Sequence, residues 1–314
     1  MRLCLSIFLI AMLFIGCSVP NASPLEDAPA REDLADKELS RTTLSLTDGE
    51  KSAIDALRAQ GPLKVAMRKV STVYEERNGE IIGYNYHLIQ EFANMMDLDL
   101  DITFVDSVTD FYAVDGAIPS QVMTQETYAY SPDLMDQVHV YADTITLLPW
   151  REEASLMIPV VPIQELLIVR LGCEVSELHE LEGKTLAIQP DSSYAFTMAQ
   201  VSETKKVTFN TFEVTTIPET ILAVSQGDAD FTIHDSNRAF IEIENSDKIQ
   251  MGIPVAEIKQ VGWAVNKDHP DLYRVLMRFI EQTKLDGRFE AYWSKDYSIT
   301  FTDYFQFLSD GAVK

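Results

Sequence analysis

Short apolar runs alternate with amphipathic stretches along most of this chain, and this alternation is what most constrains its fold. Strands are expected at residues 63–67, 81–84, 100–105, 138–142, 166–169, 184–188, 231–234 and 262–265. Helices are expected at residues 47–61, 86–96, 217–225 and 272–285, and from residue 191 or 192 onward. Residues 106–132 predict a long loop with a short helix. Strands that alternate with helices predict an α/β protein with largely parallel sheets.

The first 45 residues are expected to lie outside this folded region. Residues 3–15 are almost wholly apolar and follow Arg2, but they are fewer than the ~20 needed to span a membrane. We therefore predict a signal peptide over residues 1–16. Residues 17–45 are rich in Pro, Ala, Asp, Glu and Ser, which predicts a flexible tether.

Gly16-Cys17 resembles the lipobox of bacterial lipoproteins. This resemblance implies that Cys17 is acylated and becomes the new N-terminus. The alternative is a plain secretory signal in which Cys17 is incidental. Cys4 would leave with the signal peptide, so Cys173 has no partner for a disulfide and is expected to be a buried apolar residue.

Composition bounds the remaining possibilities. The chain has 314 residues, 46% of them hydrophobic, which suits one large or two medium domains with sizeable cores. Its net charge of −24 argues against nucleic acid as a partner. The five histidines are scattered without metal-ligand spacing, and there is no phosphate-binding glycine motif. We therefore expect no metal and no cofactor.

Two opposite charges stand at or just beyond the ends of strand-like runs. Arg151 ends the segment DTITLLPWR, and Asp235 ends GDADFTIHD. An arginine can hold a carboxylate through two parallel hydrogen bonds, and an aspartate can hold an ammonium group. A cleft with one residue on each wall would bind both charged ends of an amino acid. The alternative is that both residues are ordinary surface charges.

Hydroxyl groups accompany these two charges. Thr144 and Thr146 fall where a strand runs into a loop, the edge at which open α/β sheets bind ligands. They also alternate simply because strands alternate. Ser192 and Ser193 begin a helical run, and a helix N-terminus attracts anions, although Ser192 can equally be an ordinary N-cap.

Aromatic residues give two further hypotheses. Tyr74 precedes the turn Asn78-Gly79 and could stack on a ligand, or it could pack on its strand neighbours. The aromatic-rich stretch at residues 289–307 is expected to form core and docking surface rather than a site.

Six motifs occur in an order that resembles the bacterial extracellular solute-binding proteins of family 3, the periplasmic receptors for polar amino acids. They are GYNYHL at 83–88, TITLLPWR at 144–151, QPDSS at 189–193, GDADFTIHD at 227–235, GWAV at 262–265 and DGRFEAYW at 286–293. The likeness extends to the binding-protein-like N-terminal domain of membrane-bound lytic murein transglycosylase F, without the transglycosylase domain.

The resemblance implies a type II periplasmic binding protein, with two α/β lobes joined by a two-strand hinge that closes on the ligand. Lobe 1 would comprise residues 46–165 plus 259–314, and lobe 2 residues 166–258. Arg151 and Thr146 match the residues that hold the ligand carboxylate, and Ser193 the helix-start residue that assists them. Asp235 matches the aspartate that takes the α-amino group, and Tyr74 lies near the aromatic residue that packs over the ligand.

This chain departs from the family pattern at several positions. Asp191 replaces a glycine before the serine pair, and Asn85 and His87 stand where acidic residues are common. The expected function is binding of an amino acid or amino-acid-like molecule by a monomeric periplasmic lipoprotein, for an ABC permease or for sensing peptidoglycan fragments. A dehydratase-like enzyme on the same fold is the rival of another class, with Glu75, Asp143 or Asp191 as its acid. No nucleophile–base pair or metal set supports it.

Overall fold

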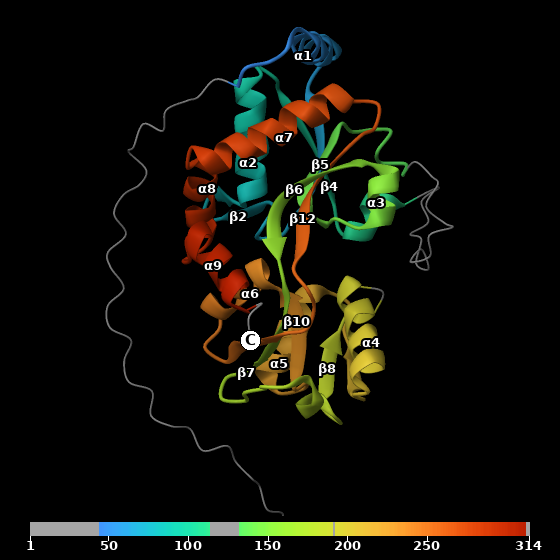
Figure 1. The fold of residues 1–314 in the computed structure, drawn as a ribbon, viewed down its shortest axis with the longest axis vertical. Coiled ribbons are helices and arrows are strands. Elements are labelled where there is room, and N and C mark those ends of the chain that lie inside the picture. The colour runs from blue at the N-terminus through green and yellow to red at the C-terminus, as the bar shows by residue number, and fades with distance from the viewer. Residues whose placement is uncertain (1–43, 114–131, 191, 312–314) are drawn as a thin grey trace, which may run out of the picture.

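Two α/β lobes lie end to end along the long axis of the computed structural model, which describes residues 44–113, 132–190 and 192–311 (Figure 1). The predicted signal peptide, most of the tether, Cys17 and Asp191 fall outside these residues. Within the described part of the chain, no helix has both the length and the apolar character needed to cross a membrane.

The first lobe is built on a five-stranded sheet. Its strands, in spatial order, are β4 (Leu100–Val105), β1 (Leu63–Arg68), β5 (Val140–Thr146), β12 (Lys259–Val265) and β6 (Leu156–Ile163). β1 runs parallel to β4 and β5, whereas β12 is antiparallel to β5 and β6. Its helical segments are α1 (Asp48–Gln60), α2 (Tyr84–Met95), η2 (Val108–Tyr112), α3 (Pro149–Ala154), α7 (Pro270–Leu285), α8 (Arg288–Asp296) and α9 (Phe301–Gly311). A small hairpin, β2 (Glu75–Arg77) with β3 (Glu80–Ile82), precedes α2.

The second lobe has its own five-stranded sheet. Its strands, in spatial order, are β11 (Ile249–Pro254), β7 (Glu165–Arg170), β10 (Phe231–Asp235), β8 (Thr185–Ile188) and β9 (Asn210–Glu213). Its helical segments are η4 (Leu178–Leu181), α4 (Ser193–Lys205), α5 (Ile217–Gln226) and α6 (Ser236–Glu244). β8 is parallel to β9 and β10, and β7 is antiparallel to β10 and β11.

The chain crosses between the lobes twice in extended form. β6 leads through Gln164 into β7, and β11 returns through residues 255–258 to β12. Midway along β12 its backbone approaches β6 closely, because a Cβ at Gly262 would lie 1.8 Å from the carbonyl oxygen of Ile158. Only glycine fits there. The predicted α/β fold with two lobes and a two-strand hinge is therefore confirmed, while the exact lobe boundaries stay predictions.

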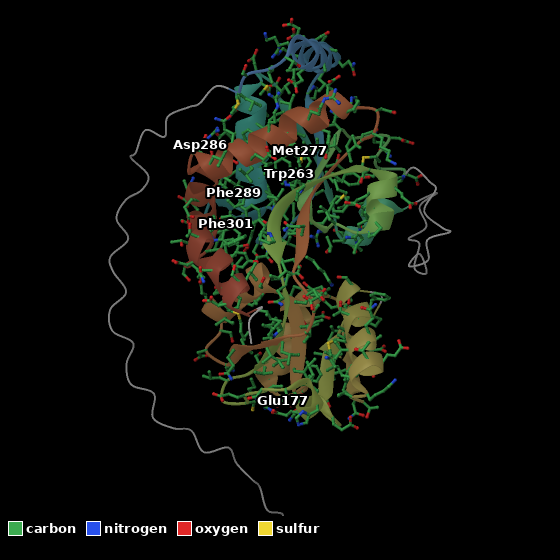
Figure 2. All side chains as sticks on the ribbon, in the orientation of Figure 1. Glu177, Trp263, Met277, Asp286, Phe289 and Phe301 are labelled. Atoms are coloured by element: carbon green, nitrogen blue, oxygen red, sulfur yellow. The ribbon has the colours of Figure 1, made fainter. Side chains whose placement is uncertain are left out.

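Each lobe buries its own apolar core. Trp263 lies in the centre of the first lobe and is fully buried, while Phe289 and Phe301 line the flank formed by α8 and α9 (Figure 2). A separate cluster that includes Phe231 and Ile233 fills the second lobe. The aromatic C-terminal stretch thus forms core, as expected.

Local sequence signals explain several element ends. Thr47 and Glu50 form a reciprocal capping box at the start of α1, and Thr216 and Glu219 form another at α5. Buried residues recur along α7 at Leu272, Val275, Leu276, Phe279, Ile280 and Thr283, the spacing of an amphipathic helix.

Some elements differ from the sequence-based expectations. The strands β2, β6, β9 and β11 and the helices α3, α6, α8 and α9 were not predicted. β6 carries Pro159 and Pro162, which argue against a central strand but suit the sheet edge that β6 occupies. Tyr84, expected to end a strand, begins α2 instead. Cys173, expected to be buried, is half-buried and free.

Candidate functional site

Asp235 lies where the second lobe meets the hinge. It ends β10 at the N-cap position of α6, and its backbone N–H donates to the Tyr194 hydroxyl at 3.2 Å. The antiparallel register of β10 and β7 places it directly opposite Glu165. Two acidic side chains therefore share one end of this sheet.

The surroundings of Asp235 disfavour its ionised form. Burial raises the pKa of Asp235 to about 7, and the nearby charge of Glu165 adds to this effect, whereas Lys259 and Arg238 oppose it. A cation entering this site would favour the carboxylate form and lower the pKa again. The position is suited electrostatically to an incoming positive group.

Glu165 is buried and tied to the other hinge strand. Its Oε2 lies 2.9 Å from the Nζ of Lys259, which begins β12 and also donates to the Thr197 hydroxyl of α4 at 3.4 Å. Lys259 thus connects one hinge strand to the other and to a helix of the second lobe. The second acidic group at the site is held by an ion pair within the protein.

Arg151 lies in the first lobe, in the short helix α3. It is 8% exposed, its Nη1 donates to the carbonyl oxygen of Thr146 at 2.9 Å, and its guanidinium lies 5.2 Å from the ring centroid of Tyr112. The interpretation of Arg151 as an ordinary surface charge is therefore wrong. Thr146 and Thr144 are half-buried near the end of β5, on the same face of the strand.

The structure places the two serines at the start of α4. Ser192 is the N-cap: its hydroxyl accepts from the N–H of Ala195 at 3.1 Å and donates to the carbonyl oxygen of Gln189 at 2.7 Å. Ser193 is the first helical residue and is exposed. The N-cap alternative for Ser192 is confirmed, and it leaves the first turn of the helix available to an anion.

Tyr74 packs on neighbouring aromatic rings. Its ring lies 5.2 Å from that of Tyr86, edge to face, and 4.8 Å from that of Phe104, while its hydroxyl donates to Glu76 at 3.0 Å. These contacts agree with the alternative of a tyrosine packed on its neighbours. Stacking on a ligand stays a prediction.

The sequence analysis missed an ion pair at the same edge of the first sheet. Arg68 ends β1, and its Nε lies 3.1 Å from both carboxylate oxygens of Asp143 on β5, which is fully buried. The backbone N–H of Arg68 also donates to Asp143 at 2.8 Å, and Nη2 donates to the Thr144 hydroxyl at 3.2 Å. Thr144, predicted as a ligand residue, is thus engaged by Arg68.

Groups of the second lobe also affect the pKa of Arg68. Burial lowers the pKa of Arg68, but Asp143, Tyr194 and Asp235 together raise it above its usual range. No local sequence pattern signals this arrangement, because Arg68 and Asp143 are 75 residues apart. The parallel pairing of β1 with β5 is what brings them together.

A groove of about 670 Å³ lies elsewhere on the second lobe, between α5 and the β8–β9 edge of the sheet. Its walls include Phe212, Glu213, Glu219 and Leu222. None of the predicted ligand residues lines it. The charged residues Asp235, Glu165 and Lys259 lie instead at the hinge, and the candidate site is taken to be there. Within the described segments, no group of three or more His, Cys, Asp or Glu side chains is placed to hold a metal ion.

Comparison with known proteins finds relatives of this chain in several bacteria. The chain is 22% identical over 240 residues to membrane-bound lytic murein transglycosylase F of Ectopseudomonas mendocina, and 26% identical over 241 residues to that of Alcanivorax borkumensis. Each match covers 75% of this chain but 46% and 48% of the relative. The chain thus spans about half the length of these relatives. No family model matches it.

Solved structures of amino-acid-binding proteins share the fold. A mutant of ArgBP from T. maritima superposes with a TM-score of 0.59 at 22% identity, covering 79% of this chain and all of the other. The cysteine-binding protein of Campylobacter jejuni gives 0.60 at 14%, covering 78% and 92%. AncCDT-1, an ancestral amino acid-binding protein and precursor of cyclohexadienyl dehydratase, gives 0.60 at 17%, covering 78% and 99%. The chain therefore has the type II fold of the periplasmic amino-acid-binding proteins and is related in sequence to about half of membrane-bound lytic murein transglycosylase F.

Proposed function

We propose that this protein binds an amino acid, or a small molecule like one, between its two lobes. The observation that carries the proposal is the setting of Asp235, a half-buried carboxyl group at the hinge with a pKa of about 7. Lys259 is already paired with Glu165, and a ligand ammonium group would add a cation that favours the carboxylate form of Asp235. The fold shared with amino-acid-binding proteins supports the same conclusion.

In this proposal the two lobes bind opposite ends of the ligand. Arg151 and Thr146 of the first lobe would hold the carboxylate, assisted by Ser193 at the N-terminus of α4. Asp235 would hold the ammonium group. Arg151 donates to the Thr146 carbonyl, so one side of its guanidinium is already fixed, which lowers the entropy cost of orienting it. Ligand binding would shift the population toward closed lobes.

The cellular setting follows from the sequence features. We propose a periplasmic protein, monomeric and anchored to an envelope membrane through Cys17, with either an inner-membrane ABC permease or a sensing pathway as its partner. The relation to lytic murein transglycosylase F favours peptidoglycan fragments as ligands for the sensing alternative. Mass spectrometry of the mature N-terminus tests the anchor, and an unacylated Cys17 would exclude it.

A thermal-shift screen against the common amino acids and small muropeptides tests the proposal. A ligand that binds only the folded state must raise the melting temperature, by an amount that grows with ligand concentration. Shifts with amino acids that disappear in Asp235→Ala would support the receptor. Shifts with muropeptides alone would favour envelope sensing, and the absence of any shift would contradict the proposal.

A dehydratase-like enzyme is a second candidate, favoured by the likeness to the dehydratase precursor. Two of the expected acids are engaged within the protein: Asp143 by Arg68, and Glu75 by Arg77 at 3.0 Å. This engagement weighs against either one as a free general acid. Incubation with prephenate or arogenate, followed by detection of the aromatic product, decides between the two candidates.

A further inference from the structure

Arg68 uses only part of its guanidinium within the protein. Nε and Nη2 are engaged by Asp143 and Thr144. Among the hydrogen bonds of the described residues, none has Nη1 of Arg68 as its donor. The side chain is 15% exposed. The ion pair with Asp143 therefore fixes the orientation of the guanidinium and leaves one nitrogen free to donate.

The position of this nitrogen is defined by the groups around it. Arg68 stands at the end of β1, next to the β5 residues Asp143 and Thr144. From the second lobe, Tyr194 and Asp235 both act on its charge and raise its pKa. Arg68 therefore lies within electrostatic reach of the proposed ammonium site, but it is not the residue proposed to hold the ligand carboxylate.

The chemistry of this environment limits the ligand groups that it can accept. A guanidinium only donates hydrogen bonds, so its partner must carry an acceptor. Arg68 and Asp143 together are close to neutral, which suits a carboxamide as well as a carboxylate oxygen. A cationic side chain would be repelled by Arg68 and would find Asp143 already paired. A purely apolar side chain would leave the free nitrogen without a partner once the lobes close.

We propose that Arg68 is a specificity-determining residue that selects ligands whose side chain ends in an acceptor oxygen, such as a carboxylate or carboxamide. This inference rests on the proposed function, because it needs a ligand held between the lobes. Asp143 acts as a positioning residue, since it orients Arg68 without facing the ligand itself.

Calorimetric titration of the full chain in mild detergent tests the inference with shape-matched ligands. Aspartate and asparagine are each compared with leucine, which has the same shape. Glutamate and glutamine are each compared with homoleucine. Lysine serves as the cationic probe. We expect at least one acceptor-bearing ligand to bind tenfold or more tightly than its apolar match, and lysine to bind weakly. Tighter binding of a carboxylate than of its carboxamide would indicate selection by charge. Equal binding of the two would indicate selection by the acceptor oxygen.

Arg68→Lys is the informative variant, because lysine keeps a charge for Asp143 but loses the planar fork. This variant should bring the ratio of the two affinities, for the acceptor-bearing ligand and for its apolar match, close to one. The affinity for the apolar ligand should stay within about threefold of the wild-type value. A double variant, Arg68→Gln with Asp143→Asn, gives the same readout should the single variant fold poorly. Melting curves check the fold of both.

The outcomes separate the two proposals. Wild-type protein that binds amino acids without preference for an acceptor, or a preference that survives in both variants, overturns the role of Arg68 alone. Wild-type protein that binds none of the amino acids overturns this inference, and only if it also binds no muropeptide is the proposed function overturned with it. A reduced preference with unchanged apolar affinity supports both.

Discussion

The hydroxyl groups of Tyr304 and Ser236 lie 2.7 Å apart, joining the C-terminal helix α9 to the first residue of α6 in the second lobe. Tyr304 donates to the carbonyl oxygen of Pro162 on β6 at 2.8 Å, and Ser236 accepts from the N–H of Gln164 at 3.0 Å. Both residues are fully buried. Because Pro162 and Gln164 flank the crossing from β6 to β7, the C-terminal helix is coupled directly to the hinge.

We expect Tyr304→Phe to lower the free energy of unfolding by about 1–3 kcal/mol, because it leaves the Pro162 carbonyl and the Ser236 hydroxyl without their partner. Chemical denaturation measures this loss. The matched control is Tyr297→Phe: this hydroxyl is also buried but meets no hydrogen-bond geometry with the described residues, and Asn237 is the smallest influence on its pKa, so a smaller loss is expected. Equal losses in the two variants would contradict the coupling.

Local patterns in the sequence were sufficient for the elements with strong caps or clear periodicity. The helices predicted at residues 47–61 and 272–285 are present as α1, which has a capping box at Thr47, and α7, which has a regular apolar spacing. β6 was missed because Pro159 and Pro162 remove backbone donors, a loss that only an edge position tolerates. An edge position is a property of the assembled sheet, and no local pattern reports it.

In the candidate site, too, local sequence patterns pointed to some residues and missed others. Arg151 and Asp235 were predicted as ligand residues because each follows a strand-like run, and they stay predictions, whereas Arg68 was not considered. Its significance depends on Asp143, which reaches it only through the pairing of β1 with β5. The burial of Glu165 beside Asp235 depends likewise on the register of β7 and β10. Contacts between distant strands are set by tertiary pairing, so sequence spacing could not reveal them.

The hinge ion pair gives a prediction about stability. Lys259→Met should destabilise the protein by about 3 kcal/mol, at the lower end for a broken buried pair, because Glu165 is buried while Lys259 is 30% exposed. Adding Glu165→Gln should recover much of the loss. Denaturant titration of the two single variants and the double variant measures the coupling.

The control for this cycle is Lys51→Met. Lys51 pairs with Asp48 at 3.5 Å on the surface, where both side chains are well exposed, so a loss well under 1 kcal/mol is expected. A loss for Lys259→Met no larger than that of the control would show that the hinge pair does not stabilise the fold.

Arg151→Ala should abolish measurable ligand binding while leaving a folded protein. Losing one partner of a desolvated charge pair costs on the order of 2–5 kcal/mol of binding free energy, roughly 30- to several thousand-fold in Kd. A modest fall in melting temperature is also expected, because the side chain contacts the Thr146 carbonyl and the Tyr112 ring. Calorimetry and melting curves report the two effects separately.

Arg274→Ala is the control for Arg151. Arg274 is an exposed arginine on α7 that pairs with Asp271 on the same helix. It should leave ligand affinity unchanged. Should Arg151→Ala bind as tightly as this control, the assignment of Arg151 to the ligand carboxylate would be wrong.

The pKa of Asp235, about 7 in the free protein, predicts that ligand binding is linked to proton release. The ammonium group requires the ionised carboxylate, so affinity should fall by up to tenfold for each pH unit below 7. Calorimetry at pH 6 in two buffers of different ionisation enthalpy should show close to one proton released, and much less at pH 8. Asp235→Asn should abolish both the release and the pH dependence.

The sign of the stability effect follows from the same pKa. A carboxyl group whose pKa is higher in the folded state stabilises that state at low pH, and this contribution is lost as pH rises through about 7. Asp235→Asn should therefore raise the melting temperature of the free protein at pH 8 relative to wild type. Asp296, whose pKa burial also raises to about 7, accepts from the N–H of Gly83 in the first lobe. The Asp296→Asn variant should still release a proton when it binds the ligand. If proton release is lost in this variant, the titrating group is Asp296 and not Asp235.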